Sequence, residues 1–130
     1  MPGGTAPGAH LDATALGQPV FDALGQQIGP LAALYADART GGVMFGGVHM
    51  LRRGRRRLVF VSLSEATVGP SSVTVRCGKE LVRRAPSVRP GERLPVDEEQ
   101  ALFVHYELPV PPRSGDGRRL VACGGDGAAS

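Results

Sequence analysis

Short apolar runs, separated by clusters of turn-forming residues, follow one another through residue 76 of the chain. Apolar runs of this kind are typical of β-strands, and Gly, Pro and Asp between them are typical of turns. The run at 58–63 is apolar on both faces, which indicates a central strand. The pattern predicts strands at residues 17–21, 27–35, 43–51, 58–63 and 73–76.

Helical periodicity occurs only after these strands. Residues 77–84 allow a turn or two of helix before Pro86. A longer helix is predicted from Asp97, which forms a capping box with Gln100, to the residues before Pro109. We expect one face of this helix to pack on the strands, and that face consists of Ala101, Leu102, His105 and Tyr106.

Glycine and proline mark the ends of the predicted folded part. The chain has 130 residues, which is enough for one domain, and it contains 19 Gly and 11 Pro. These residues are most frequent in residues 1–10 and 111–130. We therefore predict a flexible N-terminal tail at 1–14, a β domain at 15–77, a helical extension packed on it at 78–110, and a flexible tail at 111–130.

The strands and turns predict a mainly β fold, a small antiparallel β-barrel or curled sheet with a C-terminal α-helix. Residues 17–22 read Gly-x-x-Val-x-Asp, and Gly25 and Ile28-Gly29 follow. Further pieces come in order: Asp37, Thr40-Gly41, Val61-Ser62-Leu63, Ala85-Pro86-Ser87-Val88 and Asp97-Glu98-Glu99. This succession resembles the PRC-barrel domain, and its later part is similar to the C-terminal helical extension of stand-alone bacterial members. Pro30 and Gly46-Gly47 depart from the family pattern.

The resemblance implies a compact PRC-type antiparallel barrel of about six short strands, filled by its own side chains. It also implies a docking or assembly function, and no catalytic site is shared among such domains. We therefore expect a non-enzymatic protein-interaction module that binds a protein partner or forms a homodimer. The expected contact is an exposed strand edge or the helix face. No cofactor and no small-molecule substrate are expected.

Arginine dominates the charge of the chain, whose formal net charge is +3. The candidate site is a basic run around Gly54 that would bind phosphates or an acidic protein surface, and it consists of Arg52, Arg53, Arg55, Arg56 and Arg57. The alternative function is therefore an RNA- or ribosome-associated factor that uses this hairpin tip. A second basic group, Arg83, Arg84, Arg89 and Arg93, is expected to pair with Glu98, Glu99 and Glu107.

Catalytic and metal-binding motifs are absent from the sequence. The three His residues have no Cys, Asp or Glu at metal-ligand spacing, so no metal site is predicted. Asp22 and Asp37 fit turn positions, where they would accept local hydrogen bonds. A thiol enzyme or sensor built on Cys77 would need an exposed thiol, with a pKa lowered by Arg76 and Lys79.

Targeting signals are also absent from the pattern. No run approaches the roughly 20 apolar residues of a membrane helix. Residues 1–5 have neither a basic start nor an apolar run, unlike a secretory signal. The two cysteines are too few for a disulfide framework. We expect a cytoplasmic protein without membrane insertion.

Overall fold

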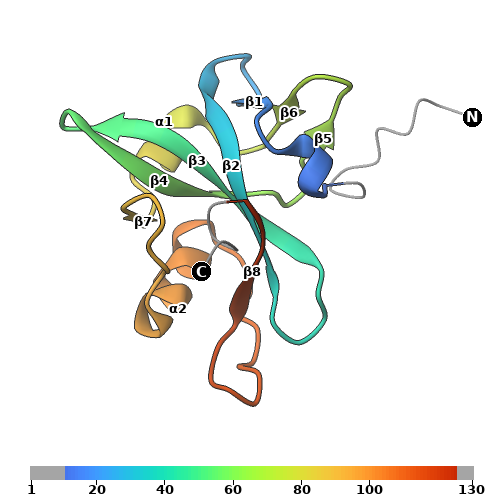
Figure 1. The fold of residues 1–130 in the computed structure, drawn as a ribbon, viewed down its shortest axis with the longest axis vertical. Helices are drawn as coiled ribbons and strands as arrows, with labels where there is room; N and C mark the ends of the chain where they lie inside the picture. Colours follow the sequence, from blue (N-terminus) through green and yellow to red (C-terminus); the bar gives the residue numbers. More distant parts are fainter. Residues whose placement is uncertain (1–10, 126–130) are drawn as a thin grey trace, which may run out of the picture.

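The computed structural model describes residues 11–125 of the chain, and this part is mainly β (Figure 1). Its strands are β1 (Pro19–Phe21), β2 (Gln27–Asp37), β3 (Val43–Arg52), β4 (Arg55–Ser62), β5 (Thr67–Val68), β6 (Val73–Thr74), β7 (Ser87–Val88) and β8 (Leu120–Gly125). Its helices are a 3-10 turn (Ala13–Ala15), α1 (Lys79–Arg83) and α2 (Val96–His105). The predicted mainly β class is therefore confirmed, and five of these strands lie where the sequence pattern predicts strands.

The sheet is open, so the expected closed barrel is wrong. The strand order in the described residues is β5-β6-β1-β2-β3-β4-β7, with β8 also paired to β2. Closure would require a ladder between the end strands β5 and β7, which are two residues long each. Instead, α2 covers the apolar side of the sheet, and Phe103 of α2 meets Phe45 of β3 with ring centroids 5.1 Å apart.

Both predicted tails contain ordered structure. Leu11 is buried, and Asp12 caps the 3-10 turn by accepting a 2.9 Å hydrogen bond from the Thr14 N–H. In the C-terminal region β8 pairs with β2 over Leu120 to Gly125, so its backbone is satisfied in a sheet. The prediction of flexible tails is therefore wrong for residues 11–14 and for β8. Residues 1–10 and 126–130 of those predictions lie outside the described residues.

Glycines let the central strands approach closely. A Cβ on Gly29 would lie 2.3 Å from the carbonyl oxygen of His49, so a side chain there would push β2 away from β3. A Cβ on Gly46 would lie 2.7 Å from Leu31 Cδ1, which agrees with the close packing that strand glycines indicate. Pro30 lies opposite Pro19, the first residue of β1. The two prolines exchange no backbone hydrogen bond at this position, so the ladder does not need the N–H that each of them lacks.

Helix α2 packs through a face that only partly matches the predicted one: Leu102 and Tyr106 are buried as predicted, and the other two residues are not. Its N-cap is Pro95 with no side-chain cap, so the predicted capping box at Asp97 is wrong. Ala101 is exposed and His105 is half-buried, whereas the fully buried side chains of the helix are Glu99, Leu102 and Phe103. Glu99 accepts a 2.8 Å hydrogen bond from the N–H of Arg119, just before β8. This buried carboxylate thus fixes the start of the last strand to α2. No helix among residues 11–125 has the length and apolar character to cross a membrane.

Candidate functional site

The outer end of the β3–β4 hairpin projects from the body of the sheet (Figure 1). Its last paired positions are Met50 with Arg57, Leu51 with Arg56, and Arg52 with Arg55. The pairing of β2 with β3 begins at Val48, and β7 pairs with β4 only at Leu58 and Val59. The arginine-rich end is therefore a two-stranded ribbon beyond its neighbouring strands.

A tight turn closes this ribbon. Arg53 has φ 53° and Gly54 has φ 76°, so both residues of the two-residue loop are left-handed. Positive φ at both loop residues is typical of a type I′ turn, whose twist matches that of paired strands. A left-handed arginine costs roughly 1 kcal/mol relative to glycine. The turn points the Arg53 side chain into solvent, where it is exposed.

Arg52 and Arg57 bind their own chain. The Arg57 Nε donates to Ser87 Oγ at 3.0 Å, and its Nη2 donates to the Ser87 carbonyl at 3.0 Å. Arg52 donates to Ser87 Oγ at 3.1 Å and to the carbonyls of Arg83 and Ala85. Burial, and after it the neighbouring Arg57, lowers the pKa of the Arg52 guanidinium. These two arginines therefore attach the hairpin to Ser87 of β7 and to the backbone just before that strand.

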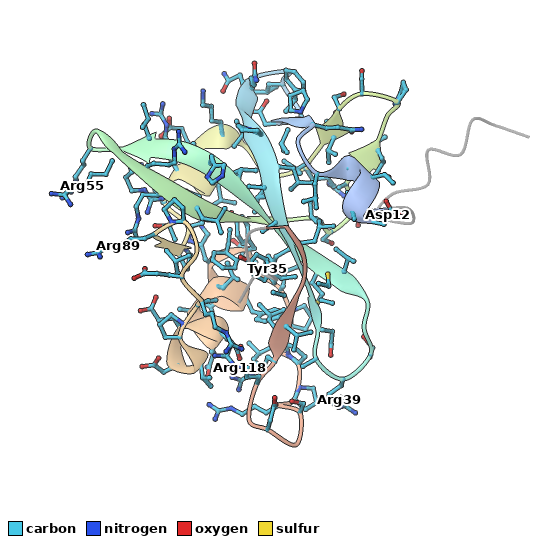
Figure 2. The ribbon with its side chains drawn as sticks, viewed as in Figure 1. Asp12, Tyr35, Arg39, Arg55, Arg89 and Arg118 are labelled. Atoms are coloured by element: carbon cyan, nitrogen blue, oxygen red, sulfur yellow. The ribbon has the colours of Figure 1, made fainter. Side chains whose placement is uncertain are left out.

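Arg53, Arg55 and Arg56 are exposed, and Arg89 joins them from the loop after β7. Among residues 11–125, no carboxylate forms an ion pair with any of these four arginines. A shallow hollow of about 390 Å³ is lined by Arg55, Arg56, Arg57, Arg89 and Pro90. Figure 2 shows Arg55 at the far end of the hairpin and Arg89 on the same side of the molecule, both directed outwards. We call Arg53, Arg55, Arg56 and Arg89 the basic tip.

An apolar side chain lies within the basic tip. Leu51 is 76% exposed and pairs with Arg56 across the ribbon, so both project from the same face. A second hollow of about 330 Å³ is lined by Met50, Leu51, Arg52, Arg53 and Arg83. The sequence pattern did not single out Leu51, and it placed Arg89 in the second basic group rather than beside the hairpin. Strand alternation applied to the hairpin register would have placed Leu51 beside Arg56, whereas Arg89 comes from a distant loop and has no local signal.

The structure thus divides the predicted site of Arg52, Arg53, Arg55, Arg56 and Arg57. Arg53, Arg55 and Arg56 remain available to a partner, whereas Arg52 and Arg57 do not, because the chain itself uses their donors.

The expected ion pairs of the second basic group do not form. Arg83 pairs with Glu80 of its own helix at 3.3 Å, and Glu99 pairs with Arg118 at 3.4 Å. Arg118 is brought to Glu99 by β8, a strand that the sequence pattern did not predict. Glu98 and Glu107 are exposed, and no arginine of the described residues pairs with them.

The remaining candidate reactive residues, Cys77, Asp22 and Asp37, interact with the fold around them. Cys77 is half-buried, burial raises the pKa of its thiol, and Arg76 pairs with Glu65, so the exposed thiol of lowered pKa that a Cys77 enzyme or sensor would need is not formed. Asp22 and Asp37 accept turn N–H bonds as predicted, and Asp22 also accepts a 3.0 Å bond from the N–H of Lys79 at the start of α1.

Binding space inside the fold is small. A partly open hollow of about 30 Å³, room for about one water, is lined by residues that include Tyr35, Phe60 and Glu99. Within residues 11–125, no group of three or more His, Cys, Asp or Glu is placed to hold a metal ion.

The fold and its surface define a mainly β domain with an open sheet, a covering helix and a projecting basic ribbon. No protein-family model matches the chain, and no curated protein matches it in sequence.

Proposed function

We propose that this chain is a non-enzymatic interaction module that docks on an acidic protein surface through the basic tip and Leu51. The observation that carries the proposal is a 76% exposed leucine that shares one face of the ribbon with Arg56 and one hollow with Arg53, and neither arginine has a carboxylate partner in the described residues. Arginine is enriched at protein interfaces because it combines an apolar stem with a planar, multidentate head. An apolar centre with a polar rim is also the usual arrangement of a protein interface.

The architecture is consistent with docking. The resemblance to PRC-barrel domains, carried by the Gly-x-x-Val-x-Asp sequence of residues 17–22, favours an assembly function. No neighbouring strand of the described residues pairs with the ribbon, and the hydrogen bonds of Arg52 and Arg57 to Ser87 of β7 hold it in place. A rigid ribbon reduces the entropy that is lost on binding.

RNA binding through the same arginines is the alternative function. The phosphate backbone would attract the basic tip, and such binding would fall steeply with salt. Single-stranded nucleic acid is usually held by bases stacked on exposed aromatic rings. Phe60, the aromatic residue nearest the ribbon in the sequence, is fully buried. The exposed Leu51 gives phosphate groups nothing to bind, so the surface favours a protein partner.

The experiment that tests this proposal places a photo-crosslinking residue at position 51. Position 24 is the matched control, since Leu24 is an 83% exposed leucine at the β1–β2 turn. In nuclease-treated extract of the native host, we expect position 51 to cross-link one protein that position 24 does not. Arg55→Gln with Arg56→Gln should abolish that cross-link, whereas Arg39→Gln with Arg113→Gln, at exposed positions elsewhere, should not.

Two outcomes would contradict the proposal. Equal cross-linking from positions 51 and 24, or a cross-link that survives loss of Arg55 and Arg56, would show that the basic tip is not the docking surface. RNA that cross-links to position 51 in untreated extract, and is lost on nuclease treatment, would establish the alternative.

A further inference from the structure

The outer face of α2 is an exposed surface that the fold leaves uncovered. Asp97 and Glu98 are exposed in its first turn, and Glu107 is exposed just after its last residue. Val104, on the same helix, is 59% exposed. Asp97, Ala101 and Val104 follow the spacing that places residues on one stripe of a helix. We call Asp97, Glu98, Val104 and Glu107 the acidic face.

No cation among residues 11–125 forms an ion pair with this face. The ion pairs of the described residues are Arg76 with Glu65, Arg83 with Glu80, and Arg118 with Glu99. None of them involves the acidic face or the basic tip. The described chain thus carries two uncovered surfaces of opposite charge, each with one exposed aliphatic side chain, Leu51 in one and Val104 in the other.

The two surfaces do not meet within one molecule. Figure 1 shows the hairpin and α2 on the same side of the molecule, with the hairpin projecting away from the helix. Arg55 points outwards from the end of the ribbon rather than back to α2 (Figure 2). A second copy, related by a two-fold axis, would bring each basic tip to the other copy's acidic face. In that two-fold arrangement both tip-to-face contacts form at once, so neither surface is left for a third copy and the assembly closes as a dimer.

We propose that the partner of the basic tip is a second copy of this chain, bound through the acidic face of α2. This inference rests on the proposed function, since it uses the same surface of the hairpin. Opposite charges steer the two copies together and fix their orientation, and contact between Leu51 and Val104 removes apolar area from water. Like-charged pairings of the two copies, tip on tip or helix on helix, are disfavoured for the same electrostatic reason.

Charge reversal of each surface tests the proposal by sedimentation and light scattering. The tip variant carries Arg53→Glu, Arg55→Glu and Arg56→Glu, and the helix variant carries Asp97→Lys, Glu98→Lys and Glu107→Lys. We expect the wild type to dimerise, and each variant alone to dimerise at least about 100-fold more weakly, because both contacts then join like charges. Mixing the two variants should restore a heterodimer, because both contacts then join opposite charges again.

Salt gives a second measurement on the wild type. Raising the ionic strength from about 0.1 M to about 1 M shortens the screening length from about 10 Å to about 3 Å, which should weaken the dimer. The control, Arg39→Glu with Arg113→Glu, changes exposed arginines elsewhere and should leave dimerisation unchanged. Circular dichroism of each variant establishes that it is folded before association is compared.

The outcomes separate this inference from the proposed function. A wild type that stays monomeric, or variants that associate equally alone and mixed, would overturn the dimer. If cross-linking from position 51 to a different protein still depends on Arg55 and Arg56, the docking function stands without it. A charge-dependent dimer whose tip cross-links only to a second copy would identify that copy as the partner.

Discussion

The hydroxyl of Tyr106 replaces a missing backbone donor in the sheet. Strand β4 pairs with β7 at Leu58–Val88 and Val59–Ser87, so the next position sets Phe60 opposite Pro86. The Phe60 N–H donates to the Pro86 carbonyl at 3.2 Å, but proline has no N–H to return the bond. The Tyr106 hydroxyl donates to the Phe60 carbonyl instead, at 2.6 Å. Burial raises the pKa of the Tyr106 phenol, which keeps this donor protonated.

Replacing Tyr106 with Phe should therefore destabilise the fold. The substitution keeps the ring, whose centroid is 6.1 Å from that of Phe45, and removes the donor. A buried carbonyl left without a partner costs roughly 1–3 kcal/mol, so we expect a loss of about 2 kcal/mol in the free energy of unfolding. For a chain of this length that corresponds to a decrease of about 7 °C in Tm. Urea unfolding followed by circular dichroism measures the change, with the m-value unaltered.

A double-mutant cycle with Pro86→Ala tests whether the missing N–H of Pro86 is what makes the Tyr106 hydroxyl necessary. Alanine at position 86 supplies an N–H opposite the Phe60 carbonyl, so Tyr106→Phe should cost less than about 1 kcal/mol in that background. The effect of Pro86→Ala on the unfolded chain cancels in the cycle. An equal cost of Tyr106→Phe in both backgrounds, or no cost in the wild type, would refute this account of the ladder.

Three further predictions test other contacts of the fold, and the first has Gly78→Ala as its control. Gly29→Ala would place a Cβ 2.3 Å from the His49 carbonyl oxygen, so it should lower the free energy of unfolding by about 3 kcal/mol. The control Gly78→Ala, whose Cβ meets open space, should change it little. Chemical denaturation measures both. Glu99→Ala should cost about 3 kcal/mol and raise amide exchange of β8 above that of β4, because Glu99 accepts N–H bonds at the start of β8. Burial acts to raise the pKa of Asp22, but hydrogen bonds from three backbone N–H groups and the charge of Lys79 hold that pKa below 3.8. The stabilisation by the ionised Asp22 is therefore present above pH 3.8. It is lost as the pH falls through the lower pKa of the native state. The difference in urea midpoint between wild type and Asp22→Asn should therefore be large at neutral pH and disappear in acid, and a difference independent of pH would contradict this.

Local patterns predicted the long strands well. Strands β2, β3 and β4 lie within a few residues of the predicted ranges, because alternation and turn residues act over a few neighbouring positions. Strands β5 and β7 are two residues long, too short for any pattern to register. β8 contains two glycines and follows a Pro-rich segment, so its composition resembled a tail. Its pairing with β2 overrides that composition, because the ladder satisfies its backbone.

In the candidate site, too, some features follow from the sequence alone and others depend on tertiary contacts. The tight turn at Arg53 and Gly54 and the exposure of Arg55 and Arg56 follow from sequence alone. The capture of Arg57 by Ser87 does not, because the two residues are 30 positions apart. Glu99 illustrates the limit most clearly: a glutamate in an acidic helical turn reads as exposed, yet its contact with the start of β8 buries it fully.

The amino-acid sequence by itself determined where the main strands and turns lie and that a cluster of arginines closes one hairpin. Those features depend on side-chain periodicity and on the backbone preferences of Gly, Pro and Asp, which operate between near neighbours. Only the tertiary structure decided that the sheet stays open, that α2 covers it, and which arginines remain free for a partner. These outcomes depend on contacts between residues tens of positions apart, such as Tyr106 with Phe60, whose formation rests on the packing of the whole chain.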